Sequence, residues 1–193
     1  MRKQWSLRMV AGGLALCALC GFMAASAHGQ AITGQWEFDN GNLKASIGSD
    51  ASYWIKPASP RDIENETQFG TTTSFGLPDI GGQPAKVMKF PQCAPHMGYA
   101  MYPGAEANGG GTYVNEFTLI MDILYPAASD AKWRSLVQTN ECNGNDGDFF
   151  INTANGIGIG GSYQGTIAPN TWYRVAWSIN CANTTGSVYF ASV

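Results

Sequence analysis

Between residues 113 and 180 the chain alternates short apolar runs with turn residues. Along residues 113–125 the period is two, so one side of the predicted strand is wholly apolar and the other is mixed. This pattern is typical of a strand with one face on a core and the other partly in water. The apolar set is Phe117, Leu119, Met121, Ile123 and Tyr125; the mixed set is Thr118, Ile120, Asp122 and Leu124.

A second alternating run covers residues 171–180 and predicts Tyr173, Val175, Trp177 and Ile179 inside, with Trp172, Arg174, Ala176 and Ser178 outside. Many short strands between Gly- and Pro-marked turns, with no helix, predict an all-β, antiparallel two-sheet sandwich. Trp36 and Phe38 are expected to anchor its core. The remaining strands are predicted at residues 35–38, 72–75, 86–90, 98–102, 133–139, 148–152, 156–160 and 187–191.

The first 27 residues have the layout of a secretory signal peptide. A basic start precedes an apolar run at residues 10–22, and Ala25-Ser26-Ala27 fits a small-x-small cleavage site. The alternative, a membrane anchor, suits this run less because a span needs about 20 apolar residues. We expect a signal peptide at residues 1–27, one domain at 28–193, and a secreted protein: extracellular, periplasmic or on the cell surface.

Charge narrows the expected partners. Without the three basic residues of the signal peptide, eight Lys and Arg face fourteen Asp and Glu, a net charge of −6. An acidic surface argues against nucleic acid and anionic membranes as partners. We also expect no membrane insertion after cleavage, which leaves extracellular glycan or protein.

Three cysteines follow the signal peptide, at positions 93, 142 and 181, so at most one internal bridge can form. Cys142 and Cys181 each lie just past a predicted strand, and export permits disulfides, so they are the predicted pair. The alternative is a zinc site that adds Cys93 and His96; its ligand types suit zinc, but the scattered spacing does not.

Five runs together resemble the bacterial laminin-G-like jelly rolls of the concanavalin A-like lectin/glucanase superfamily. They are FTLIMDILYP (117–126), RSLVQT (134–139), DGDFFIN (146–152), GIGIGGSYQG (156–165) and NTWYRVAWSIN (170–180), with a weaker match at WEFDNGNLKAS (36–46). The resemblance implies a jelly roll that serves as a non-catalytic module for glycans or proteins, sometimes with calcium.

One departure from this family concerns the C-terminal end. In the family the Trp-Tyr-Arg strand is followed by a strand ending near Tyr-x-Asp-Gly and by at least one more, whereas this sequence ends at Val193. The resemblance therefore implies a jelly roll that is incomplete at its C-terminus. An unpaired edge of that kind is adhesive or unstable. The alternatives are a truncated gene, a sequence that is a fragment, or a partner that supplies the missing strand.

Catalysis finds little support in the sequence. Glycosidases on this scaffold need two carboxyl groups about 5 to 10 Å apart. Glu116 and Asp122 share a strand face, but their separation along the strand is about 20 Å. A pair from different strands, such as Asp122 with Asp148, stays open. A serine triad would have to use His96, and no Gly-x-Ser-x-Gly motif is present.

Two kinds of binding site are predicted instead. The run NGNDGD (143–148) offers hard oxygen ligands for calcium from Asn143, Asp146 and Asp148, although a polar turn is the alternative; Asp79 is a weaker candidate. Sugar rings stack on exposed aromatic faces. The candidates are Trp172 with Arg174 beside it, then Trp133 and Tyr163, while packing against a loop or sheet is the alternative for Trp172.

These observations predict an exported, non-catalytic binding or adhesion module for extracellular carbohydrate or protein. The alternatives are a truncated remnant of a larger surface protein without independent activity, and a glycoside hydrolase or lyase.

Overall fold

The protein is described from a computed structural model that covers residues 31–55, 62–94, 96–138, 148–181 and 188–192, the last of these by backbone alone. Strands dominate, so the all-β class predicted from the sequence is confirmed. All of the strands belong to the unit that runs from Ile32 to Val193.

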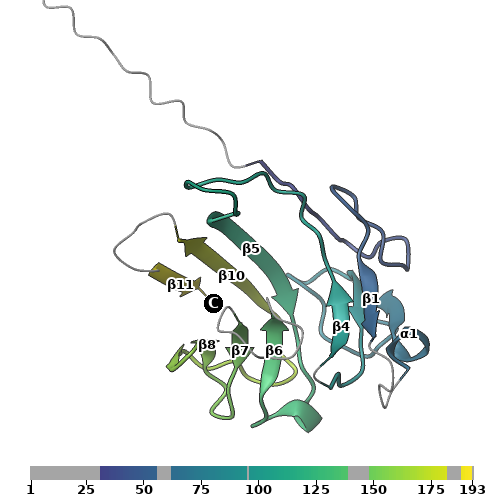
Figure 1. Ribbon diagram of the computed structural model, residues 1–193. Helices are drawn as coiled ribbons and strands as arrows, with labels where there is room; N and C mark the ends of the chain where they lie inside the picture. The colour runs from purple at the N-terminus through teal and green to yellow at the C-terminus, as the bar shows by residue number, and fades with distance from the viewer. Residues whose placement is uncertain (1–30, 56–61, 95, 139–147, 182–187, 193) are drawn as a thin grey trace, which may run out of the picture. The chain divides into compact units, whose positions relative to one another are not determined.

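The two longest strands lie side by side in a three-stranded antiparallel sheet (Figure 1). In it, β10 (Tyr173–Asn180) lies between β5 (Glu116–Ile123) and β11 (Val188–Ser192). The apolar faces of β5 and β10 coincide, because Leu119 lies opposite Trp177. The predicted alternation is confirmed: Trp177 is 1% exposed, whereas Ile120 on the opposite face is 61% exposed.

Four short strands form a second sheet, in which neighbours along the chain pair antiparallel. The last two strands are joined at Gly160 and Gly161, and Gly160 has φ +57°, a conformation that glycine adopts without strain. The sequence analysis did not anticipate β9. The strands are β6 (Arg134–Val137), β7 (Phe149–Ile151), β8 (Ile157–Ile159) and β9 (Ser162–Gln164).

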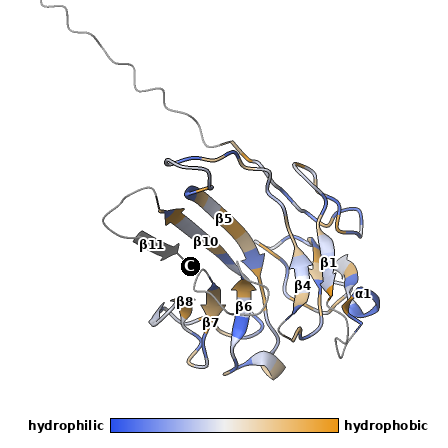
Figure 2. Ribbon diagram, in the orientation of Figure 1, coloured by the Kyte–Doolittle hydropathy of each residue, from blue (hydrophilic) through white to orange (hydrophobic). Residues whose placement is uncertain are grey.

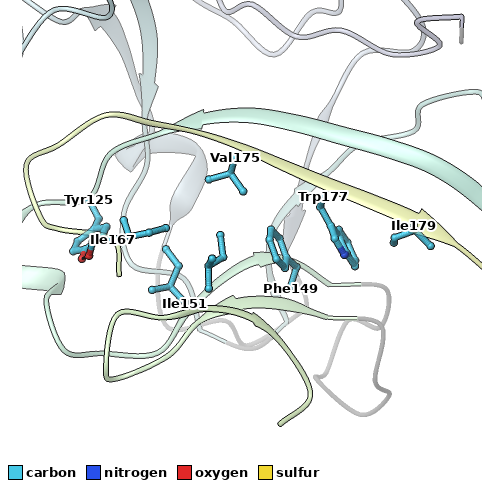
Figure 3. Close-up of a cluster of buried hydrophobic side chains, with 8 residues drawn as sticks. Tyr125, Phe149, Ile151, Ile167, Val175, Trp177 and Ile179 are labelled. Carbon is cyan, nitrogen blue, oxygen red and sulfur yellow. Dashed lines mark hydrogen bonds between the residues drawn. The ribbon is translucent and has the colours of Figure 1, made fainter. Parts of the chain in front are cut away.

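These two sheets share one hydrophobic cluster. The ring of Phe149 stacks on Trp177 at 4.9 Å between centroids, and Phe117 meets Trp177 edge-on at 6.0 Å. Figure 2 shows the hydrophobic stretches along β5, β7 and β10, and Figure 3 shows Phe149 and Trp177 side by side. Each fully buried side chain of this kind contributes about 1.5–3 kcal/mol. The buried members are Tyr125, Phe149, Ile151, Ile157, Ile167, Val175, Trp177 and Ile179.

Before β5, the described residues form two separate antiparallel strand pairs and one helical turn. The helix begins at the N-cap Asp62, whose carboxylate accepts the Asn65 N–H at 3.1 Å. A 3₁₀ turn at Ala127–Ser129 follows β5. The strand pairs are β1 (Ser52–Ile55) with β4 (Met97–Ala100) and β2 (Gln68–Thr71) with β3 (Lys86–Lys89), and the helix is α1 (Ile63–Glu66).

Three predictions for this part are wrong. Residues 35–38 are not a strand: Gln35 makes only an isolated bridge to Ile47, and Phe38 has φ +59°, which ends extended backbone. Trp36 and Phe38 are half-buried rather than core anchors. The expected absence of a helix is also wrong, because of α1.

The strand predicted at residues 72–75 is wrong as well, because residues 72–76 form a turn and the strand precedes them as β2. Local side-chain hydrogen bonds favour the turn. The Ser74 N–H donates to Thr71 Oγ1 at 3.0 Å, and the Thr71 N–H donates to Ser74 Oγ at 2.8 Å. Hydroxyl groups that satisfy nearby backbone in this way compete with strand pairing.

Candidate ligand-binding surface

The outer face of the four-stranded sheet carries three aromatic side chains, Trp133, Phe150 and Tyr163, which we call the aromatic cluster. The Trp133 ring lies edge-on to Tyr163 with centroids 5.6 Å apart, and edge-on to Phe150 at 6.1 Å. Trp133 is nevertheless 59% exposed. An exposed ring held by two neighbours offers a flat apolar surface that loses little conformational entropy when it binds.

Gly158 of β8 makes room for the cluster. It pairs with Phe150 on one side and with Tyr163 on the other, so those two residues lie about 10 Å apart. Trp133 contacts both rings and therefore bridges the space between them. A Cβ atom at Gly158 would come within 1.9 Å of the Ser162 carbonyl oxygen, so any other residue would force the backbone to shift.

Hydrogen bonds fix the backbone on both sides of Trp133. The Nη2 atom of Arg134 donates to the Asn152 carbonyl at 3.2 Å and to Asn155 Oδ1 at 2.6 Å. Asn155 in turn donates from Nδ2 to Asp130 Oδ1 at 2.8 Å. Because Asp130 precedes Trp133 and Arg134 follows it, this network ties the segment that carries the indole to the turn between β7 and β8.

Arg134 is held from below by Tyr125. Its guanidinium carbon lies 3.9 Å from the centre of the Tyr125 ring, within cation–π range. The Tyr125 hydroxyl donates to the Ile167 carbonyl, which fixes the ring. Among the described residues, Arg134 Nε and Nη1 are buried without a hydrogen-bond partner. Stacking and the bonds from Nη2 therefore hold Arg134, which acts as a positioning residue for Trp133.

A buried carboxylate lies close to the cluster. Asp148 is only 6% exposed and precedes Phe150 by two residues, on the same side of the strand. Burial, and secondly the charge of Asp148, raise the pKa of Tyr163. The Tyr163 hydroxyl therefore stays protonated at neutral pH and can both donate and accept a hydrogen bond at the side of the cluster.

The other two predicted ligand residues lie on a different sheet. Trp172 is half-buried, and its Nε1 donates to the Pro78 carbonyl at 2.7 Å. Arg174, on the outer face of β10, donates from Nε and Nη2 to the two oxygens of Asp122 at 2.8 and 2.7 Å. The outer faces of two sheets that share a core point away from each other, so the four predicted residues form two separate surfaces.

Of the predicted calcium ligands, only Asp148 is described; Asn143 and Asp146 lie outside the described residues. Asp79, the weaker candidate, accepts a hydrogen bond from the buried Thr72 hydroxyl at 2.7 Å. In the part of the chain that the structure describes, no three His, Cys, Asp or Glu residues form a group that could hold a metal ion. The calcium site stays a prediction.

The predicted disulfide also stays a prediction, because Cys142 lies outside the described residues. Cys181 is exposed directly after β10, and its N–H donates to the Asn115 carbonyl at 2.7 Å. The alternative zinc site would need Cys142 too. Its other members, Cys93 and His96, lie in the connection between β3 and β4.

Asp122, the carboxylate that the sequence offered for a catalytic pair, has the environment of an ion-pair partner. Hydrogen bonds from Arg174 are the main cause that lowers the pKa of Asp122. A glycosidase acid must instead hold its proton near neutral pH, which requires a raised pKa. Asp122 is therefore suited to an ion pair on the surface of β5 rather than to catalysis.

Sequence reasoning named Trp133 and Tyr163 but missed Phe150 as their neighbour. The run Phe149-Phe150 does not say which ring faces outward, because both are apolar. The pairing of Phe150 with Gly158 settles it. The glycines of residues 156–160 were a usable signal, since a glycine on an outer face leaves space for a large ring from a neighbouring strand.

Comparison with known proteins adds no relative: the chain matches no protein-family model, no curated protein and no solved structure. Within the described residues, no helix is long and apolar enough to cross a membrane. Any functional assignment therefore rests on the residues themselves.

Proposed function

We propose that the chain is an exported, non-catalytic binding module that takes extracellular carbohydrate on the aromatic cluster. The observation that carries the proposal is Trp133, a large ring that is 59% exposed although the sheet beneath it is well packed. Among the described residues from 116 to 180, only Trp133 and Ile120 are large hydrophobic side chains with high exposure. Keeping a large apolar ring in contact with water is unfavourable in free energy. A ring that is nevertheless held in place at the surface suits stacking on a sugar.

The surroundings of the cluster support the same ligand class. Sugars present apolar C–H faces edged by hydroxyl groups, so a binding surface needs a ring and a polar edge. Trp133 supplies the ring, and the Tyr163 hydroxyl beside it supplies the polar edge. The rings meet edge-to-face, which is a favoured aromatic geometry and holds the platform in position.

The scaffold that we propose is a laminin-G-like jelly roll. In its favour are the antiparallel pairing, the two sheets on one core and the sequence runs that resemble this family. Export by a signal peptide at residues 1–27 and a Cys142–Cys181 disulfide belong to the same proposal.

A glycan array with the mature chain tests the function, followed by calorimetric titration with a glycan that binds. Trp133→Ala should weaken binding about tenfold or more, because it removes a stacking contact of about 1.4 kcal/mol. Trp54→Ala is the matched control: Trp54 is also exposed, at 40%, but lies on β1. An array without any bound glycan, or equal losses in the two variants, would contradict the proposal and favour a protein ligand.

Calcium is a separate part of the proposal, assigned to Asn143, Asp146 and Asp148. A metal that binds the native state alone raises the unfolding temperature. We expect millimolar calcium to raise that of the wild type, EDTA to reverse the rise, and Asp148→Asn to abolish it. Wild-type unfolding that is indifferent to calcium would remove the metal site and leave the aromatic cluster unaffected.

A further inference from the structure

One edge of β5 has no partner strand in the described structure. The Cys181 N–H bonds to the Asn115 carbonyl, so every second residue from Asn115 onward directs its backbone groups toward β10. The residues between them direct theirs to the other side. Thr118, Ile120 and Asp122 therefore form an edge, which we call the β5 edge.

Within the described residues, the backbone N–H and C=O groups of the β5 edge make no hydrogen bond on that side. Only the start of the strand is closed: Asn108 donates from Nδ2 to the Glu116 carbonyl at 2.7 Å and accepts the Glu116 N–H at 2.7 Å. Unpaired strand edges readily accept another strand, and natural edges usually carry Lys, Pro or a bulge that prevents it. The β5 edge has no Lys, Pro or bulge, and the charge of its one acidic residue, Asp122, is paired with Arg174 on β10.

The side chains leave the β5 edge accessible. On the outer face, Thr118 donates to the Ser178 hydroxyl at 3.1 Å, and Asp122 accepts from Arg174, so both lean toward β10. Ile120 lies between them and is 61% exposed, with no polar group to explain its exposure. A second strand at this edge would cover it.

We infer that the β5 edge pairs with the same edge of a second copy of the chain, antiparallel and with the two-fold axis at Ile120. Ile120 then exchanges hydrogen bonds with Ile120 of the second copy, and Thr118 with Asp122 of the second copy. On the inner face the same register sets Leu119 opposite Met121, so apolar side chains meet on both faces.

Charge selects this register over its neighbours. A shift in one direction sets Glu116 opposite Asp122 of the second copy, and like charges directly opposite each other are destabilising. The opposite shift sets Thr118 opposite Leu124, which lies beyond the end of β5. Only the register centred on Ile120 uses all three edge residues without opposing two carboxylates.

Sedimentation velocity of the full mature chain across the micromolar range tests the inference. We expect a reversible dimer that Ile120→Lys weakens at least tenfold, because two ammonium groups would meet on the axis. Ala176→Lys is the matched control: Ala176 lies opposite Ile120 on the interior strand β10, on the same face. The inference is overturned if the chain stays monomeric. It is also overturned if Ile120→Lys and Ala176→Lys raise the dissociation constant of the dimer equally.

Substitutions at Thr118 test the register itself. Thr118→Lys sets an ammonium group opposite Asp122 of the second copy and should tighten the dimer several-fold. Thr118→Glu sets two carboxylates there and should weaken it several-fold. Both side chains are long, polar and exposed in the monomer, so they differ chiefly in charge. Equal dissociation constants for the two variants would overturn the pairing, even if Ile120→Lys had simply prevented folding.

Discussion

The described residues from 116 to 180 form six strands and those from 32 to 114 form four, and the two segments pack their strands differently. Every buried member of the hydrophobic cluster belongs to the first segment. The second segment has buried apolar side chains of its own, such as Ile63 and Val87, but they are not part of that cluster. Most of the exposed large hydrophobic side chains among the described residues also lie in this second segment. They are Ile32, Ile47, Trp54, Ile55, Phe90, Met101, Tyr102 and Tyr113.

The difference teaches where an exposed apolar residue is informative. In the described residues from 32 to 114 exposure of large apolar side chains is common, so a single exposed one there says little about function. In the described residues from 116 to 180 it is confined to Ile120 and Trp133, each above a packed core. Those two positions carry the proposed self-association and the proposed ligand surface, because isolated exposure in a well-packed region needs a reason of its own.

The largest expected effect is the difference in stability lost when a tryptophan is removed from each segment. Trp177→Ala removes a ring that is 1% exposed and stacked on Phe149, and should lower the free energy of unfolding by about 3–5 kcal/mol. Trp54→Ala, at 40% exposure, should cost about 1 kcal/mol. Urea denaturation followed by circular dichroism measures both. Equal costs would remove the contrast between the segments.

A pair of glycines gives an intermediate effect within the four-stranded sheet. Gly158→Ala should destabilise the fold by about 1–3 kcal/mol and displace Trp133, because the new Cβ meets backbone of β9. Gly161→Ala should change stability by no more than about 0.5 kcal/mol, since nothing lies within 4 Å of its Cβ position. Thermal unfolding and near-ultraviolet circular dichroism report the two effects. A harmless Gly158→Ala would mean that the cluster does not depend on this close approach.

The smallest expected effect is that of the ion pair between Asp122 and Arg174. The folded protein lowers the pKa of Asp122, so the pair stabilises fully above about pH 4, the usual pKa of an aspartate. This contribution is lost as the pH falls through the lower pKa of the folded state. Asp122→Asn should remove that small acid-dependent loss and leave the core unchanged. An identical pH dependence of the unfolding temperature in wild type and variant would show that the exposed pair contributes nothing.

How far the sequence determined the structure also differs between the segments. The alternation in β5 and β10 was read correctly residue by residue, because one face of each strand is apolar throughout. Before residue 114 the strands are four residues long, too short to show a period. There, local features decided where strands form. Examples are the hydrogen bonds from the backbone N–H groups of Thr71 and Ser74 to each other's hydroxyl oxygens, and the positive φ of Phe38.

The ligand surface was predictable only in part. Exposed aromatics pointed to Trp133 and Tyr163 individually, but their contact depends on strand pairing through Phe150 and Gly158. The support from Arg134 was not visible either, since its partners Asn152 and Asn155 lie 18 and 21 positions away in the chain. Long-range pairing of this kind leaves no local pattern.

Hydrogen exchange of the native chain, followed by mass spectrometry, tests the contrast between the segments most directly. Amides that open only by global unfolding exchange slowest. We predict the slowest exchange in β10, which is paired on both sides and buries Val175 and Trp177. Exchange in β1 and β4 should be faster, because we expect these strands to open locally, at a lower free energy than global unfolding requires. Equal protection of β4 and β10 would contradict the account, because it would mean that one cooperative core spans both segments.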